Sequence, residues 1–263
     1  MPELPEVEYM LHRLTPRVLS RRIKHAEILD FNFVGFGPAA ARSRVVDAVI
    51  TDAQRRGKFL LLFLESGYTL IFHMGMTGAL TLAAQTDPVE KGVRLRLALE
   101  GNQEIRYRTV RKLGRIALVK GRDVASLGML AHLGIEPLSP ACNSQVLQAL
   151  VTGYRGTVKS LLMAQHKIAG IGNMYADEIL FRARIHPAAR ADRLSKSQIT
   201  RLHTVMRSVL REAVRDLEGL ELKTSWLFNH RSEADRCPRC HGPIRRMEIV
   251  GRSSYFCPRC QKA

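Results

Sequence analysis

Hydrophobic and polar residues alternate in short runs over residues 22–119, a pattern that predicts β-strands. Turn residues such as Glu100-Gly101-Asn102 separate the runs. The clearest predicted strands are Arg44–Ile50, Phe59–Leu64, Thr69–His73, Val93–Leu99 and Glu104–Tyr107. Because several short strands with regular turns suit antiparallel sheets, we expect a sandwich or a barrel in this part of the chain.

The spacing of apolar residues becomes helical beyond the proline-containing stretch that ends at Pro140. In the longest helical pattern, apolar residues recur on one face between Ile199 and Ala213, and Ser195 supplies a start signal. The predicted helices are Ser144–Leu150, Thr157–Gln165, Met174–Arg184 and Ser195–Leu217, together with a short one, Val7–Leu14, near the N-terminus.

These patterns predict an α+β fold in three segments. Residues 1–136 hold the predicted strands and the N-terminal helix, and residues 137–225 are predicted to be helical. Glycine, cysteine and arginine dominate residues 226–263, a segment too short to bury a hydrophobic core by itself. For the whole chain of 263 residues, a hydrophobic content of 46% is ample for packed cores and argues against global disorder.

Basic residues outnumber acidic ones, with 41 Lys and Arg against 24 Asp and Glu, so that the formal net charge is +17. An excess of this size is typical of proteins that neutralise phosphate backbones. An anionic membrane is the alternative partner, but the sequence has no polybasic run, lipidation motif or apolar run of ~18–20 residues. It also has no apolar core of a secretory signal. We therefore expect a nucleic-acid partner and no membrane partner.

Four of the five cysteines form two Cys-Pro-Arg-Cys pairs, Cys237/Cys240 and Cys257/Cys260. Two thiolate pairs at hairpin spacing predict a tetrahedral site for one Zn²⁺, which is structural because four sulfur ligands leave no open position. Chance pairs or a redox dithiol are the alternatives, but neither is usually duplicated at this spacing. Cys142 stands alone and is expected to be a small buried or loop residue. Arg252, between the pairs, is either a phosphate contact or a solvated surface residue.

The N-terminal sequence Met-Pro-Glu-Leu-Pro-Glu has two interpretations. Removal of Met1 would leave the secondary amine of Pro2 beside the carboxylate of Glu3. Because the reference pKa of an α-amine is about 7.7–8.0, a neutral fraction exists at neutral pH and could attack a sugar C1′ to form a Schiff base. Alternatively, these residues simply start a helix, with Pro5 in its first turn and Glu6 complementing the helix dipole.

A glycine-rich turn and two strand ends supply further candidate residues. In the stretch from Lys167 to Met174, glycines permit a tight turn, and Asn173 could cap the next helix or bind phosphate; a purely structural helical hairpin is the alternative. Lys58 precedes an apolar strand and could equally be a solvated cation. Met76, in a glycine-flanked turn, resembles an apolar wedge inserted between bases, whereas a lone His73 is more typical of a structural histidine.

Together these motifs resemble the formamidopyrimidine-DNA glycosylase and endonuclease VIII family, most closely its formamidopyrimidine branch. The resemblance covers essentially the whole chain: the Pro-Glu-Leu-Pro-Glu start, the β-rich middle, the Gly-Ile-Gly-Asn turn and the zinc hairpin follow in family order. It implies a two-lobed fold with an N-terminal antiparallel β-sandwich, a helix–two-turns–helix domain and a C-terminal β-hairpin zinc finger. It also implies a bifunctional DNA glycosylase and abasic-site lyase, which excises oxidised bases from damaged double-stranded DNA by β,δ-elimination in base excision repair.

The resemblance assigns roles to matching positions of this chain. Pro2 would be the nucleophile and Glu3 the acid/base, with Glu6 in support. Lys58 would complete the catalytic set at a position that holds a phosphate of the damaged nucleotide. The side chains implied to contact DNA, either at phosphates or by filling the gap left by a flipped base, are His73, Met76, Arg111, Leu113, Asn173 and Arg252.

Two features depart from the formamidopyrimidine pattern and affect the expected substrate. Leu113 occupies a position where this branch usually has phenylalanine, so that stacking on the unpaired partner base would be weaker. The stretch Gly219–Arg236 is shorter than the glycine-rich loop that caps 8-oxoguanine in typical members. We therefore favour 8-oxoguanine and formamidopyrimidine lesions only slightly over oxidised pyrimidines or abasic sites.

Two functions from other classes are also open. A non-catalytic lesion-binding DNA protein would keep the fold, but the presence of Pro2, Glu3 and Lys58 argues against it. A zinc-ribbon RNA-binding factor fits the charge and the cysteines but leaves the N-terminal motif unexplained. For the enzyme we expect a monomer in a bacterial cytosol.

Overall fold

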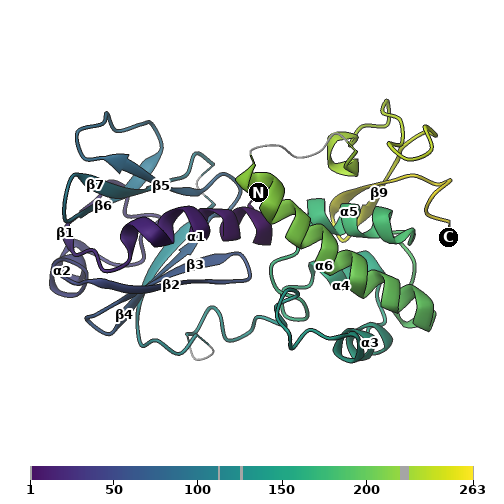
Figure 1. Cartoon of the computed structure of the whole chain (residues 1–263), viewed down its shortest axis with the longest axis horizontal. Coiled ribbons are helices and arrows are strands. Elements are labelled where there is room, and N and C mark those ends of the chain that lie inside the picture. Colours follow the sequence, from purple (N-terminus) through teal and green to yellow (C-terminus); the bar gives the residue numbers. More distant parts are fainter. Residues whose placement is uncertain (1, 112, 125–126, 220–224, 263) are drawn as a thin grey trace. The chain divides into compact units, whose positions relative to one another are not determined.

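The computed structural model describes residues 2–111, 113–124, 127–219 and 225–262 (Figure 1). The chain divides into two compact units, one of Pro2 with residues 6–132 and the other of residues 3–5 with residues 133–262. Each unit has its own hydrophobic core. The start of the chain contributes to both cores, because Leu4 packs in the second unit and Val7 in the first.

The first unit is a sandwich of two four-stranded antiparallel sheets. One sheet has the strand order β1-β6-β7-β5, with β1 (Ile23–Ile28), β5 (Ala79–Ala84), β6 (Val93–Leu99) and β7 (Gln103–Arg108). The other has the order β2-β3-β4-β8, with β2 (Ile50–Arg56), β3 (Phe59–Leu64), β4 (Tyr68–His73) and β8 (Arg115–Lys120). The strands of both sheets are in the purple-to-teal part of the ribbon in Figure 1.

The core of the sandwich follows from the alternation of the strands. In β6 the residues Val93, Leu95, Leu97 and Leu99 are buried and the residues between them are half-buried, so one face of the strand lies on the core. Side chains of both sheets, such as Leu62 and Leu97, share this core, and α1 (Leu4–Val18) adds Leu14 and Val18 to it.

The predicted strands Phe59–Leu64 and Val93–Leu99 are confirmed with the same bounds. The strand predicted over Arg44–Ile50 is wrong, because residues 38–44 form helix α2 (Pro38–Arg44) and strand β2 begins only at Ile50. Pro38 and the alanines after it favour a helix start. The apolar residues that suggested a strand, including Val45 and Ala48, enter the core from a turn.

The second unit contains α3 (Ser144–Thr152), α4 (Val158–Met163), α5 (Asn173–Ala183) and α6 (Lys196–Glu218). Two short 3₁₀ helices, η1 (Ala191–Arg193) and η2 (Leu227–Asn229), accompany them. All four predicted helices are confirmed to within two residues at each end. Ser195 starts α6 through a capping box with Gln198, as its position in the sequence predicts. One core, which includes Tyr175 of α5 and Leu202 of α6, holds the unit together.

The chain ends in a hairpin of β9 (Arg245–Ile249) and β10 (Arg252–Phe256). The predicted α+β class is therefore confirmed, with an antiparallel sandwich, a helical region and a C-terminal hairpin. The division at residues 136 and 225 stays a prediction, since the two compact units do not test it. Among the described residues, none of the helices has the length and apolar character required to span a bilayer.

Candidate active site and DNA interface

The carboxylate of Glu3 lies at the N-terminus of α5 and is almost completely buried, with 1% exposure. Its Oε2 accepts hydrogen bonds from the backbone N–H of Gly172 at 2.6 Å and of Tyr175 at 3.4 Å. Its Oε1 accepts one from Met174 at 3.0 Å. N–H groups at a helix start have no partner within the helix, and the positive end of the helix dipole faces the same way. Glu3 therefore sits in a site that stabilises an ionised carboxylate.

The turn before α5 is built around the residues that follow Pro2. The N–H of Leu4 donates to the carbonyl of Gly170 at 3.0 Å. Gly170 has φ +91°, and a Cβ there would lie 2.8 Å from the Cβ of Leu4, so only glycine fits. The side chain of Gln165 donates to the carbonyls of Met163 and Ile171 and accepts from the N–H of Gly170. These bonds fix the turn and thus the position of Glu3.

Asn173 does not cap α5, so that part of the sequence prediction is wrong. The N-cap residue is Gly172, without a side-chain cap bond, and Glu3 occupies the position in which a capping side chain would accept hydrogen bonds. Asn173 instead donates from Nδ2 to the carbonyl of Ser253 in β10 at 3.0 Å. Its Oδ1 is buried and has no hydrogen-bond partner among the described residues.

Arg252 is the exposed first residue of β10 and follows a two-residue turn, Val250-Gly251. Both turn residues have positive φ, 50° and 66°, as in type I′ hairpins. Because Asn173 binds the carbonyl of Ser253, the strand that carries Arg252 is attached to the first residue of α5. Within the second unit, Glu3, Asn173 and the start of β10 therefore gather at one end of α5.

A buried ion-pair network holds β10 on the helices. Lys159 of α4 forms an ion pair with Asp177 of α5 at 2.6 Å and donates to the Ser254 hydroxyl at 2.5 Å. Asp177 also pairs with Arg231 at 2.8 Å and accepts from the N–H of Tyr255. Burial lowers the pKa of Lys159, and the charge of Asp177 opposes this shift. The sequence interpretation missed these residues; the signal for them was a lysine between the apolar residues of the α4 sequence.

In the first unit, Lys58 and His73 lie at the same end of the β3–β4 pair. Lys58 is buried and follows Gly57 (φ +57°) in the turn that leads into β3. Phe59 is opposite His73 in the sheet, and their ring centroids are 4.8 Å apart. Burial lowers the pKa of His73, as do the positive charges of Lys58 and Arg115. His73 is thus neutral at pH 7, and Arg115, its β8 neighbour, is a cation that the sequence interpretation missed.

The loops that carry Met76 and Leu113 are in contact within the first unit. The hydroxyl of Thr77 accepts hydrogen bonds from the N–H groups of Val110 and Arg111 at 3.2 and 3.0 Å. Gly75 (φ +59°) lies so close to the backbone of Leu113 that a Cβ would be 2.4 Å from its carbonyl carbon. Met76 is 37% and Leu113 55% exposed, and Arg111 is exposed as well. These loops therefore present two apolar side chains and a cation to solvent.

Two further candidate residues, Pro2 and Glu6, lie near the start of the chain. Pro2 and Glu6 are both half-buried, and Glu6 lies in the first turn of α1. Met1 and Lys112 lie outside the described residues. Residues 220–224, the first part of the shortened stretch Gly219–Arg236, also lie outside them.

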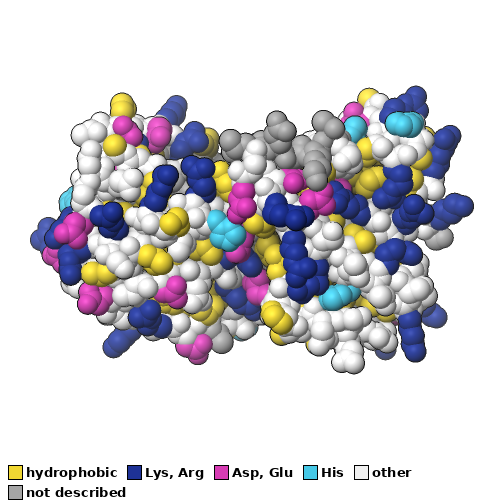
Figure 2. Space-filling view, in the orientation of Figure 1, with side chains coloured by type: hydrophobic (Ala, Val, Ile, Leu, Met, Phe, Trp, Pro, Cys, Tyr) yellow, Lys and Arg dark blue, Asp and Glu magenta, His cyan; other side chains and the backbone are white. Residues whose placement is uncertain are grey.

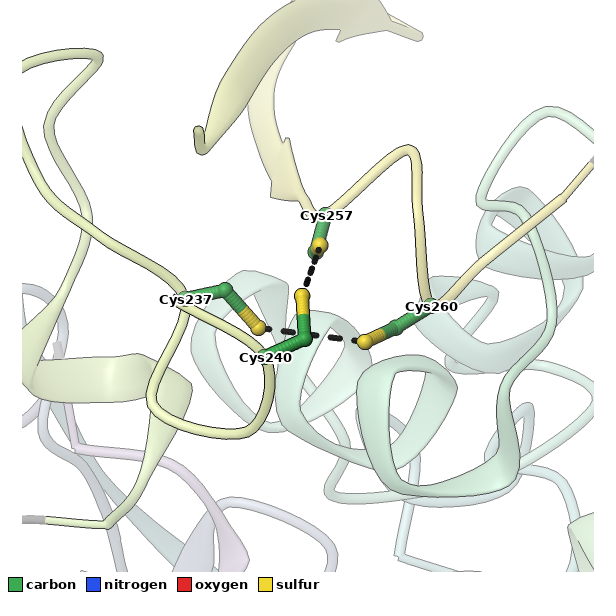
Figure 3. A group of neighbouring side chains, drawn as sticks. All are labelled: Cys237, Cys240, Cys257 and Cys260. Atoms are coloured by element: carbon green, nitrogen blue, oxygen red, sulfur yellow. Dashed lines mark hydrogen bonds between the residues drawn. The ribbon is translucent and has the colours of Figure 1, made fainter. Parts of the chain in front are cut away.

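The four predicted zinc ligands converge (Figure 3). Their Sγ atoms all lie within 4.8 Å of one another, with 3.9 Å between Cys237 and Cys260 and 3.5 Å between Cys240 and Cys257. A tetrahedral site with Zn–S bonds of about 2.3 Å has S–S distances of about 3.8 Å. The cysteines thus form a site for one structural zinc ion, packed with Phe181 of α5 in a small cluster.

Lys and Arg side chains are spread over the face of the molecule that Figure 2 shows. They are numerous over the region around β9 and the C-terminus, where few Asp and Glu side chains are seen. The predicted nucleic-acid partner requires such a surface, because each neutralised phosphate adds affinity through counterion release.

Comparison with known proteins accounts for nearly the whole chain. The model of the formamidopyrimidine-DNA glycosylase N-terminal domain matches residues 1–116, and that of the H2TH domain of the same enzymes matches residues 133–224. The model of the zinc finger found in FPG and IleRS matches residues 234–263. The chain belongs to the formamidopyrimidine-DNA glycosylase family.

The relatives have similar lengths and the same fold. The formamidopyrimidine-DNA glycosylase of Symbiobacterium thermophilum is 38% identical over 99% of this chain and 89% of its own, and that of Geobacillus kaustophilus is 35% identical over the whole of both. Lactococcus lactis FPG bound to DNA containing FAPY-dG superimposes with a TM-score of 0.89 at 28% identity, covering 99% of this chain and 100% of that one. The predicted family and enzyme class, a DNA glycosylase of base excision repair, are confirmed.

Proposed function

We propose that this chain is a bifunctional glycosylase and abasic-site lyase that removes oxidised bases from double-stranded DNA. The single observation that supports this most strongly is the fixed carboxylate of Glu3. Three backbone N–H groups at the start of α5 hold it, and Pro2 immediately precedes it in the chain. A helix-capping role alone would not require a proline on its N-terminal side.

In the proposed reaction, the damaged nucleotide first leaves the duplex, at a cost of a few kcal/mol that a lesion lowers. The neutral amine of Pro2 attacks C1′, the bond from C1′ to the base breaks, and the base leaves with the electron pair. The carboxylate of Glu3 takes the proton that the Pro2 nitrogen loses and gives it to the ring oxygen as the sugar opens to the iminium. The resulting iminium acidifies the C2′ proton, and β- and then δ-elimination release the phosphates on either side.

The remaining site residues would hold and distort the DNA. Lys58, Asn173 and Arg252 would bind phosphates, and neutral His73 would donate a hydrogen bond without adding charge. Met76, Arg111 and Leu113 would fill the gap left by the extruded base, in the manner of apolar wedges that stabilise unstacked DNA. Glu6 would support the catalytic pair from the first turn of α1.

For the lesion, we slightly favour formamidopyrimidines and 8-oxoguanine. Support comes from relatives, since Lactococcus lactis FPG has been crystallised with DNA containing FAPY-dG and also with abasic-site DNA. The second structure and the leucine at position 113 keep oxidised pyrimidines and abasic sites as the alternative substrates. Excision rates on matched duplexes that differ only in the lesion and the opposite base would rank these substrates.

We further propose that the enzyme acts as a monomer in a bacterial cytosol, without a membrane partner. The named relatives are bacterial, and the charge suits a nucleic-acid partner. Sedimentation with and without lesion duplex tests the monomer directly, since a dimer would double the mass of the free protein.

Borohydride trapping on an abasic-site duplex tests the catalytic proposal. Mass spectrometry first establishes that the chain starts at Pro2. The mature protein should then form a covalent adduct, because borohydride reduces the iminium to a stable amine. A matched chain with an N-terminal extension should bind the duplex without forming an adduct. If the mature protein binds but gives no adduct, the chain is a non-catalytic lesion-binding protein.

A further inference from the structure

A basic pocket lies at the C-terminal end of α5, next to the zinc site. It has a volume of about 610 Å³ and is lined by Arg184, Gln198, Arg239, Arg259, Cys260 and Lys262. No carboxylate lines it, and none of its four cations forms an ion pair with any carboxylate in the described part of the chain. Four cations that share a cavity repel one another, and a bound anion would relieve this repulsion. We call this cavity the α5 C-terminal pocket.

Arg184 occupies a backbone position that is normally given to glycine. It is the C-cap of α5 with φ 55° and ψ 40°, in the left-handed region, where its N–H closes the helix on Leu180 and Phe181. Glycine adopts this conformation without strain, whereas arginine does not. Because this backbone conformation favours glycine, an arginine here indicates a function for its side chain. That side chain lines the pocket.

A second guanidinium group of the pocket, that of Arg239, is held by two contacts. Arg239 donates to the carbonyl of Phe181 at 3.2 Å, and its guanidinium lies 4.4 Å from the centroid of the Phe181 ring. Arg259 packs on Gly242, where a Cβ would lie only 2.8 Å from its Cδ. Ligands bind more tightly to groups that lose little freedom on binding. The contacts with Phe181 therefore preorganise the guanidinium of Arg239.

The pocket is separate from the proposed lesion site. Helix α5 has 11 residues, which corresponds to a length of about 16 Å. Glu3 and Asn173 lie at its N-terminal end and Arg184 at its C-terminal end.

A neighbouring cavity of about 470 Å³ shares Arg239 and is also lined by the half-buried Pro238 and by the ion pair of Arg182 with Glu212. The Phe181 ring at this cavity is buried beneath the Arg239 guanidinium. Cations that form no ion pair among the described residues, with a half-buried proline beside them and away from the proposed lesion site, suit an acidic peptide.

We propose that the α5 C-terminal pocket binds an acidic peptide segment of a partner protein. Arginine pairs bidentately with carboxylates, and three arginines, Arg184, Arg239 and Arg259, line this one cavity. Pro238, beside Arg239, would contact an apolar side chain of the same segment. No residue of this pocket belongs to the proposed catalytic machinery. The proposal of peptide binding can therefore be tested independently of the proposed glycosylase and lyase activity.

The test uses the zinc-loaded full chain and a fluorescent octapeptide of aspartate, serine and one phenylalanine. A peptide with asparagine in place of aspartate is the ligand control. The key variant is Arg184→Gly, which removes the cation and also relieves the backbone strain, so its unfolding temperature should stay the same or rise. Arg211→Ala removes an exposed arginine elsewhere on α6 and is the protein control. Anisotropy should show binding of the acidic peptide only, weakened about tenfold by Arg184→Gly and unchanged by Arg211→Ala.

Three results would overturn the proposal. Equal binding of the asparagine peptide would mean that carboxylates are not recognised, and equal losses in both variants would mean that only net charge matters. If Arg184→Gly instead weakens duplex binding and lowers its salt dependence, the pocket serves DNA. Should Arg184→Gly fold poorly, Arg184→Asn also tolerates the left-handed conformation and should show the same loss. Borohydride trapping should be unchanged in both variants.

Discussion

Glu3, the proposed acid/base, shows how backbone N–H groups can fix the position of a carboxylate. Its carboxylate takes the position of a helix cap at α5, although it lies 169 residues away from Gly172 in the sequence. The backbone N–H groups that hold it cannot rotate away, so the carboxylate is oriented before any DNA binds. Glu3 caps α5 in addition to its proposed role in proton transfer, and a conservative substitution can separate these two contributions.

Glu3→Gln should slow base excision by about 10²–10⁴-fold while lesion-duplex binding is kept. The amide oxygen of glutamine still accepts hydrogen bonds from the start of α5, but it cannot transfer the proton. Single-turnover excision and equilibrium binding measured on one lesion duplex separate the two effects. Glu6→Gln is the matched control and should cost much less. Comparable excision by Glu3→Gln and the unmodified enzyme would refute the acid/base role.

His73 should make the sandwich unit sensitive to mild acid. Its pKa in the folded chain is lowered by burial and by Lys58 and Arg115, whereas in the unfolded chain it returns to about 6.5. Between these two values the unfolded state binds more protons, so His73 lowers the stability as the pH falls through about 6.5. The difference in unfolding free energy between the enzyme and His73→Asn should therefore shift against the enzyme from about pH 7.5 to about pH 5.5. A pH-independent difference would contradict this assignment.

At the scale of elements, local patterns predict far more than long-range contacts. The alternation in β6 and the start signal at Ser195 identify a strand and a helix because both depend on neighbouring residues. The prediction of a strand over Arg44–Ile50 is wrong because a β-branched residue such as Val45 can also be buried when it lies in a turn. The hydrogen bond from Asn173 to Ser253 joins two segments that are 80 residues apart in the sequence. No local sequence pattern predicts such a contact.

The same limit applies to the candidate site. The residue types and the family resemblance suggested Asn173 and Arg252, but not that one end of α5 holds both Asn173 and the strand of Arg252. Lys159 and Asp177 were missed because a buried ion pair becomes visible only when two helices are packed together. The sequence therefore predicts which side chains could form the site, whereas the fold determines which of them are in contact.

We expect Arg252 of the β9–β10 hairpin to bind one DNA phosphate. Arg252→Ala should weaken binding to every duplex alike and lower the slope of log K against log salt by about one. Arg245→Ala, at the opposite end of the same hairpin, is the control and should leave the slope unchanged. His73→Asn should also leave it unchanged, because a neutral donor releases no counterion. An unaltered slope for Arg252→Ala would mean that this arginine does not meet phosphate.

At the scale of the whole molecule, the zinc hairpin differs from the rest of the chain in what stabilises it. The sandwich buries a large apolar core that draws on both sheets and α1. The hairpin of β9 and β10 has only a small cluster, in which the buried cysteines pack with Phe181, Leu227 and Ile244. Such a segment depends on its metal, since zinc binding to four thiolates contributes about 10–16 kcal/mol in isolated zinc fingers. Loss of zinc should therefore act on the hairpin and spare the sandwich.

Zinc removal, by a chelator or by Cys240→Ser, should abolish protection from hydrogen exchange in β9 and β10 and leave β3 and β6 protected. Duplex binding should fall with it, because β10 carries Arg252 and its Ser253 carbonyl binds Asn173. Cys142→Ser removes a cysteine outside the cluster and should keep both zinc and DNA binding. If exchange in β3 and β6 rises together with that in the hairpin, the two units unfold as one, and zinc stabilises the whole chain.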